Sequence, residues 1–196
     1  TDGSTQRFDI PSGLSMVQDV YYRSKVSSTR LHACSEEFNE TVDSDITVSL
    51  DTKQRKQGSQ SNKFEIAVGA SPGDLATDSI TSKDISGYDY IEFWVRSTVA
   101  TSAGNLKLHI DDSASCASPV ESISIPALSA DTWTFVRDQI DNPELCSAII
   151  SVGLEMDSDL GACTVWLDDI SAVKNDTAQW EQIPRNLWSI DKESSD

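Results

Sequence analysis

The chain has 196 residues, of which 38% are hydrophobic and 24% are charged, so it holds enough apolar material for one globular domain. Acidic residues outnumber basic residues by 32 to 15, which gives a formal net charge of -17. Such a charge repels phosphate backbones and anionic lipid, so we expect neither nucleic acid nor a membrane as a partner. No apolar run approaches the roughly 20 residues that cross a bilayer.

The N-terminal and C-terminal segments lack the patterns of regular secondary structure. Residues 1–33 show neither sustained alternation nor a helical stripe, which predicts an extended N-terminal arm. Residues 175–196 contain Trp180 and Trp188 with a proline between them, which predicts a C-terminal tail. We expect both segments to contact a partner, because arms of this kind commonly become ordered on one.

From Ile46 onward the pattern changes to short β-rich runs that Gly, Pro, Asp and Ser clusters separate. Runs at this spacing are typical of an all-β sandwich. No segment carries a helical stripe of ten or more residues. The predicted strands span residues 46–52, 62–69, 74–81, 88–99, 105–113, 120–128, 132–140, 148–156 and 163–174.

Several of these strands alternate with the period of two that a half-buried strand requires. Each therefore has one apolar face and one mixed face, which predicts two packed antiparallel sheets rather than a parallel α/β sheet. We also place Trp133 in the core. The residues predicted to form the shared core are Ile91, Phe93, Val95, Leu106, Leu108, Ile110, Val152 and Leu154.

The four cysteines are widely separated, and no two have the CxxC spacing, which disfavours a structural zinc site. Their even number allows one or two disulfides, and it equally allows four buried free thiols. The sequence leaves both alternatives open for Cys34, Cys116, Cys146 and Cys163.

Residues 34–174 resemble a jelly-roll β-sandwich of the carbohydrate-binding-module, galactose-binding-like type. The phrases that carry the resemblance include CSEEFNE, DISGYDYIEFWVRS, LSADTWTFVRDQI and TVWLDDISAVK. The fold that this implies is an all-β, two-sheet antiparallel jelly-roll β-sandwich with an extended N-terminal arm and a C-terminal tail. The arrangement of arm, sandwich and tail is also similar to that of uncharacterised jelly-roll proteins encoded with bacteriophage particle genes.

The resemblance implies a structural calcium ion, because sandwiches of this type commonly hold one between the leading segment, a turn and the closing Asp-Asp pair. Calcium prefers hard oxygen ligands from carboxylates and carbonyls. The alternative is that Asp168 and Asp169 only cap or solvate a strand end. The residues that match are Glu37 or Asn39, a backbone carbonyl near Gln57 or Gln60, and Asp168.

The mixed faces of the strands predict a carbohydrate-binding surface. Sugars stack their apolar C–H faces on aromatic rings, while charged and amide groups form hydrogen bonds with the hydroxyls. The alternative is that Trp94 and Trp166 pack under loops or under the tail. The candidate residues are Tyr90, Glu92, Trp94, Arg96, His109, Glu155 and Trp166.

Catalytic motifs such as HExxH, GxSxG and the P-loop are absent from the sequence, so we do not expect an enzyme. The leading hypothesis is a non-catalytic structural or decoration-type protein of a bacteriophage virion. Its terminal segments would contact other virion proteins or a second copy. The alternative is a carbohydrate-binding module of a secreted polysaccharide-degrading enzyme or adhesin, with glycan as the partner. These hypotheses place the protein in a virion or outside the cell.

Overall fold

The computed structural model describes residues 21–22, 27–174 and 181–182, and the chain divides into two units. Residues Val26–Asn175 form one unit, and Thr1–Lys25 with Asp176–Asp196 form the other. In the second unit, β1 (Tyr21–Tyr22) pairs antiparallel with β13 (Glu181–Gln182). The rest of the predicted arm up to residue 26 and the remainder of the tail, including Trp180 and Trp188, lie outside the described residues.

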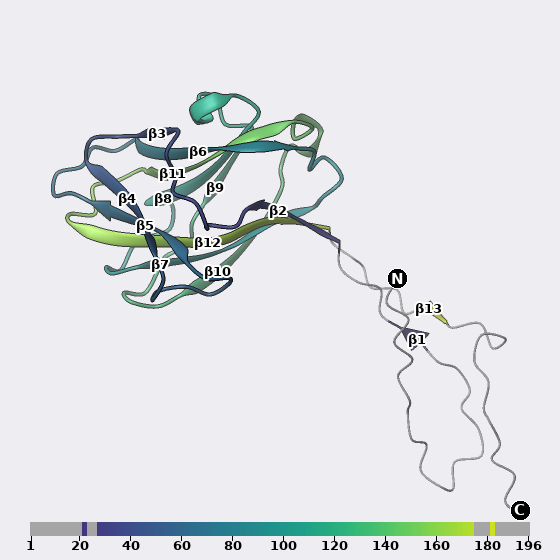
Figure 1. Cartoon of the computed structure of the whole chain (residues 1–196), viewed down its shortest axis with the longest axis horizontal. Helices are drawn as coiled ribbons and strands as arrows, with labels where there is room; N and C mark the ends of the chain where they lie inside the picture. The colour runs from purple at the N-terminus through teal and green to yellow at the C-terminus, as the bar shows by residue number, and fades with distance from the viewer. Residues whose placement is uncertain (1–20, 23–26, 175–180, 183–196) are drawn as a thin grey trace, which may run out of the picture. The chain divides into compact units, whose positions relative to one another are not determined.

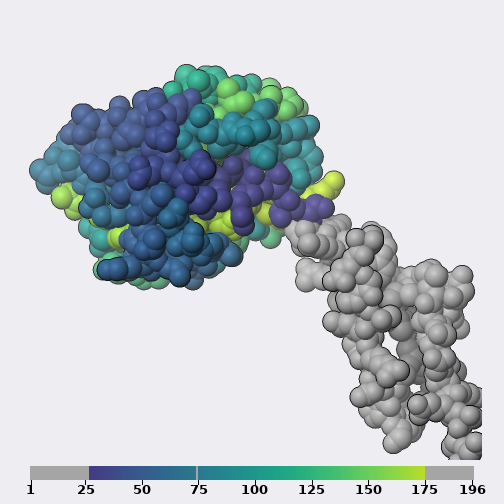
Figure 2. All heavy atoms as spheres, in the orientation of Figure 1, coloured from purple at the N-terminus to yellow at the C-terminus, as the bar shows by residue number. Residues whose placement is uncertain are grey.

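The first unit is a sandwich of two antiparallel sheets, which confirms the predicted fold class (Figure 1). In the space-filling view its residues form one continuous body (Figure 2). One sheet has six strands. Five of them follow the order β10-β7-β12-β5-β4, and the sixth, β2, pairs with the C-terminal half of β12. These strands are β2 (Ser28–His32), β4 (Ile46–Asp51), β5 (Ser61–Ile66), β7 (Tyr90–Ser97), β10 (Thr134–Gln139) and β12 (Cys163–Val173).

The other sheet has five strands in the order β3-β6-β11-β8-β9, and all its pairs are antiparallel. Two short 3-10 helices, η1 (Ala114–Cys116) and η2 (Pro143–Leu145), lie in the connections. The strands are β3 (Thr41–Val42), β6 (Asp74–Lys83), β8 (Leu106–Asp111), β9 (Glu121–Ser124) and β11 (Ile149–Met156).

Side chains from the facing surfaces of the two sheets fill the core. In β7 the buried and half-buried residues alternate without a break, as the period of two predicts. All eight residues predicted for the core are buried, with exposed fractions of 3% or less. Trp133 differs, because it precedes β10 and is only half-buried.

All nine predicted strands are present, and the sandwich also contains strands that the sequence pattern did not indicate. β2 lies in residues that we assigned to the arm, yet it pairs with β12 and buries Leu31. The sandwich therefore begins near Val26 and not at Cys34. The side chains of β2 follow no strict alternation, which is why its sequence did not predict a strand.

Two different strands pair with the same side of β12, and a β-bulge lies between the two pairings. Its register with β7 shifts between Asp168 and Ser171, and Asp169 has a φ of 54°. A bulge bends a strand and increases its twist. β5 pairs with β12 before this point, and β2 pairs with it afterwards.

The four cysteines are free and buried, so the structure favours buried thiols over disulfides. Burial raises the pKa of the Cys34 thiol to about 12 and that of Cys116 to about 11. These thiols are therefore protonated at neutral pH and unreactive.

Within the described part of the chain, no helix is long and apolar enough to span a membrane.

Candidate functional site

The outer face of the six-stranded sheet carries the row of β7 that we predicted to bind carbohydrate. Tyr90, Glu92, Trp94 and Arg96 alternate with fully buried core residues, and each is half-buried. The alternation of the strand therefore directs all four side chains away from the core.

β10 adds two residues to this row that were not among the predicted binding residues. Phe135 lies opposite Trp94, with ring centroids 5.1 Å apart, and it is 46% exposed. Arg137 lies opposite Glu92, with 3.2 Å between its guanidinium nitrogen and the carboxylate oxygen. The alternation in TFVRDQ placed both residues on one face, but only the sheet order shows that this strand lies beside β7.

Trp166 belongs to the same face but is only 6% exposed. Its indole N–H donates a hydrogen bond to the Asp51 carboxylate at 3.0 Å, and the Arg96 guanidinium lies 4.8 Å from its ring centroid. Arg96 also forms an ion pair with Asp131 at 2.8 Å. Trp166 is thus covered by its neighbours, and its ring does not offer a free surface.

The loop between β4 and β5, residues 52–60, contacts this face at two points. The backbone N–H groups of Lys56 and Gln57 donate hydrogen bonds to Oδ2 of Asp168, at 2.6 and 2.8 Å. The Lys56 ammonium lies 4.2 Å from the ring centroid of Trp94. The loop therefore covers Asp168 and brings a positive charge to the aromatic row.

His109 and Glu155 lie on the other sheet, so the structure separates them from the aromatic row. They belong to β8 and β11, and His109 Nε2 is 2.6 Å from the Glu155 carboxylate. Lys107 is 3.6 Å from the same carboxylate and 2.7 Å from that of Asp157. The candidate surface that we predicted as one face is thus two faces on opposite sides of the core.

The outer face of the five-stranded sheet offers no platform for stacking. Gly153 allows η1 to lie close to this sheet, since a Cβ there would stand 3.1 Å from the Cys116 sulfur. No Trp, Tyr or Phe occurs on the outward side of the described strands of this sheet. Those positions include Thr41, Leu75, Thr77, Ser79, Thr81, Lys107, His109, Asp111, Ser122, Ser124, Ser151, Gly153 and Glu155.

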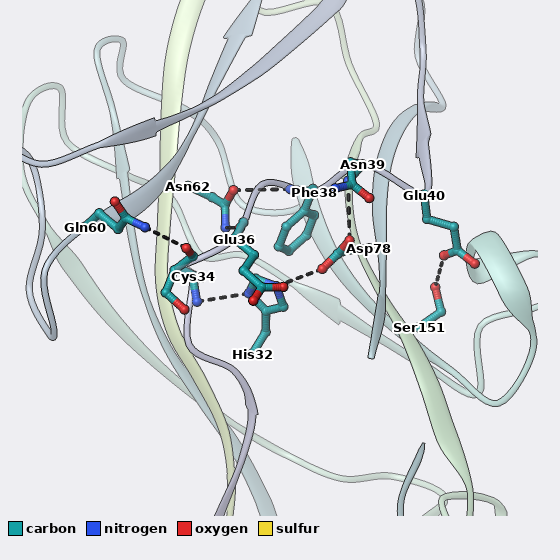
Figure 3. A network of polar contacts seen from close by, with 11 residues as sticks. His32, Cys34, Glu36, Phe38, Asn39, Glu40, Gln60, Asn62, Asp78 and Ser151 are labelled. Carbon is teal, nitrogen blue, oxygen red and sulfur yellow. Dashed lines mark hydrogen bonds and ion pairs between the residues drawn. The ribbon is translucent and has the colours of Figure 1, made fainter. Parts of the chain in front are cut away.

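A shallow groove of about 340 Å³ lies at the edge of the sandwich, between β2 and β6. His32 and Asp78 line it and form a buried pair with a separation of 2.9 Å (Figure 3). The Cys34 N–H donates to His32 Nδ1 at 3.0 Å. No Trp, Tyr or Phe lines this groove, so it too lacks a stacking surface.

The predicted calcium ligands are only partly brought together. Asp168 is fully buried, its Oδ1 has no hydrogen-bond partner, and burial raises the pKa of its carboxyl group. The only predicted ligand residue with a hydrogen bond to Asp168 is Gln57, and it contributes an N–H group rather than a carbonyl. Glu37 and Asn39 are exposed, and the Gln60 amide donates to the Ser35 carbonyl at 2.6 Å.

The buried Oδ1 of Asp168 has no hydrogen-bond partner, which fits a bound cation. Across residues 27–174 no group of three or more His, Cys, Asp or Glu side chains is arranged to hold a metal ion. Calcium at Asp168 stays a prediction, in which backbone carbonyls would supply most of the other ligands.

Comparison with known proteins relates this fold to carbohydrate-binding modules. A family 11 module from Clostridium thermocellum, in complex with a β-1,3-1,4-mixed-linked tetrasaccharide, has a TM-score of 0.54 and 15% identity, over 77% of this chain and 98% of that chain. A family 30 module has a TM-score of 0.52 and 15% identity, over 82% and 93%. At such identities the similarity shows the fold and does not show a shared ligand.

No protein-family model matches the sequence, and no curated protein matches it. The similar structures confirm the resemblance to a carbohydrate-binding-module sandwich. They do not bear on the bacteriophage context, which was predicted from segments that lie mostly outside the described residues. The virion role therefore stays a prediction.

Proposed function

We propose that this chain is a non-catalytic carbohydrate-binding module, and that it contacts glycan through the outer face of the six-stranded sheet. The observation that carries the proposal is the aromatic pair of the exposed Phe135 and the half-buried Trp94. Aromatic rings of this kind bind the apolar C–H faces of sugars. Glu92 and Arg137 lie beside the pair and supply charged hydrogen-bonding groups for sugar hydroxyls.

The fold supports this proposal, since the similar solved structures are described as carbohydrate-binding modules. Such modules act on glycans outside the cell or at its surface, and we propose the same location for this protein. The cysteine that follows His32 in the sequence does not act as a nucleophile. Cys34, the thiol beside His32 in sequence, has a pKa raised by burial to about 12, so it is not a nucleophile.

Retention on polysaccharides tests the proposal. The protein is run through native gels that contain soluble polysaccharides of several classes, and the dissociation constant is taken from the retardation. We expect Trp94→Ala and Phe135→Ala each to weaken binding by about tenfold, because each removes one stacking contact. Circular dichroism of each variant establishes that the sandwich is still folded.

His109→Ala, on the opposite sheet, is the matched control and should bind as the wild type does. If His109→Ala alone lost binding, the glycan would belong to the five-stranded sheet and our assignment of the face would be wrong. If the wild-type protein bound no polysaccharide of any class, the proposed function itself would be contradicted.

A further inference from the structure

Three aromatic rings on the outer face of the six-stranded sheet each lie beneath a positive charge. Lys56 is 4.2 Å from the ring centroid of Trp94, and Arg137 is 4.2 Å from that of Tyr90. The third pair is Arg96 with Trp166, at 4.8 Å. A cation within about 6 Å of a ring centroid is attracted by the ring quadrupole, so these are cation–π contacts.

The cations occupy the space that a stacking sugar needs. A neutral sugar would have to displace Lys56 from Trp94 or Arg137 from Tyr90, and each displacement loses a cation–π contact. An anionic sugar carries a negative charge, so these cations attract it. It keeps each cation near its ring and gains charge-assisted hydrogen bonds, which are stronger than bonds between neutral groups.

Several of the few basic residues of the sandwich gather at this face. Residues 27–174 contain ten lysines and arginines, and four of them lie at this face although the whole chain carries a net charge of -17. The four are Lys56, Lys63, Arg96 and Arg137.

The carboxylates that pair with these cations do not prevent the cations from binding a ligand. The carboxylate partners are Glu92 for Arg137, Asp131 for Arg96 and Glu65 for Lys63. All three carboxylates are partly exposed, and exposed ion pairs are weak. Lys56 is exposed and has no ion pair within residues 27–174. Its charge is therefore open to a ligand.

We propose that the ligand of this face is an anionic polysaccharide, one that carries carboxylate or sulfate groups. This inference rests on the proposed function and narrows its substrate class. Lys56 and Arg137 bind the anionic groups, and the exposed Phe135, which packs against Trp94, contacts the sugar ring. Tyr90 and Trp94 are four residues apart on β7, so the two cations stand over positions about 13 Å apart.

Titration against purified polymers tests the inference. The acidic probes are polygalacturonate and a sulfated galactan, and the neutral probes are mixed-linkage β-glucan and xylan. We expect the full-length protein to bind an acidic polymer more tightly than either neutral one, and to lose affinity as sodium chloride rises from 50 to 500 mM, because salt screens exposed charges. The two acidic probes distinguish carboxylate from sulfate.

Single charge removals locate the binding. Lys56→Gln and Arg137→Gln should each weaken binding to the acidic polymer by about tenfold. Lys107→Gln, which removes the same charge from the opposite sheet, should leave it unchanged. Equal loss in all three variants would indicate an effect of overall charge and would overturn the assignment to this face.

The outcomes distinguish a failure of the anionic-ligand proposal from a failure of the proposed carbohydrate-binding function. Binding to neutral polymers alone, without dependence on Lys56 or Arg137, would overturn the anionic ligand and keep the carbohydrate-binding function. Binding to no polymer would contradict the function. Equal affinity for single-stranded DNA would overturn a polysaccharide ligand, because faces with aromatic and basic residues also bind nucleic acid strands.

Discussion

At the scale of single residues, His32 joins the two sheets through hydrogen bonds that define its protonation state. Its Nδ1 accepts the Cys34 N–H, so in the neutral ring Nε2 carries the proton and donates it to Asp78 in β6 (Figure 3). Burial lowers the pKa of His32, although the Asp78 carboxylate opposes that shift. The folded protein therefore favours the neutral imidazole, and protonation of Nδ1 would remove the bond to Cys34.

This arrangement predicts that stability falls as the pH falls below about 6.5. The unfolded chain titrates His32 near its ordinary pKa of about 6.5, while the folded protein takes up that proton only at lower pH. The contribution of His32 is thus fully present above about pH 6.5 and is lost below it. One proton accounts for at most about 1.4 kcal/mol of unfolding free energy per pH unit.

Urea unfolding between pH 5 and pH 8 measures this slope. His32→Gln should be less stable than the wild type at pH 8 and should show a smaller loss of stability between pH 6.5 and pH 5. His109→Gln is the matched control and should retain the contribution of His32. The same slope in His32→Gln as in the wild type would show that other groups cause the pH dependence.

At the scale of the elements, strands with a strict period of two were predictable and the others were not. β7 buries Ile91, Phe93 and Val95 and leaves the residues between them half-buried, so its alternation gave both the strand and its faces. β2 has no such pattern, because it is a short strand beside the bulge of β12. Its place in the sheet depends on pairing with residues about 140 positions later, which local sequence does not encode.

The loop between β4 and β5 is an element whose stability depends on Asp168. The carboxylate accepts two N–H groups of this loop with one oxygen, and the other oxygen is buried without a partner. A buried and unpaired carboxylate oxygen is costly, and a calcium ion would relieve that cost. We therefore predict that calcium binds at Asp168.

Thermal unfolding of protein stripped of metal tests this prediction. Saturating calcium should raise the melting temperature above that in EDTA, because a ligand that binds only the folded state stabilises it by about 2.7 kcal/mol at 100 times its Kd. Asp168→Asn should abolish the difference between the two conditions. Identical melting curves for the wild-type protein in calcium and in EDTA would contradict a metal site here.

At the scale of the whole molecule, the strand order decides which predicted residues form one site. Tyr90, Trp94 and Trp166 share a face because β7 and β12 are neighbours in the six-stranded sheet. His109 and Glu155 share another because β8 and β11 pair in the five-stranded sheet. Each strand alone shows a mixed face, but the side of the sandwich on which that face lies follows only from long-range pairing.

The limits of the folded unit give the last prediction, which concerns truncation of the whole chain. The sandwich extends from Val26 to Asn175, so a protein cut to residues 26–175 should unfold cooperatively with nearly the melting temperature of the full chain. A protein cut to residues 34–174 lacks β2 and leaves the far half of β12 without a partner on that side. It also exposes the core where Leu31 was buried and leaves Asp78 without His32.

Burial of a leucine side chain alone stabilises a fold by about 1.5 to 3 kcal/mol, and the buried Asp78 carboxylate adds to the loss. We therefore expect residues 34–174 to unfold at lower temperature and lower urea concentration than residues 26–175. Scanning calorimetry of the two proteins, side by side at pH 7.5, measures the difference. Equal melting temperatures would mean that β2 is not part of the cooperative unit and that the sandwich proper begins near Cys34.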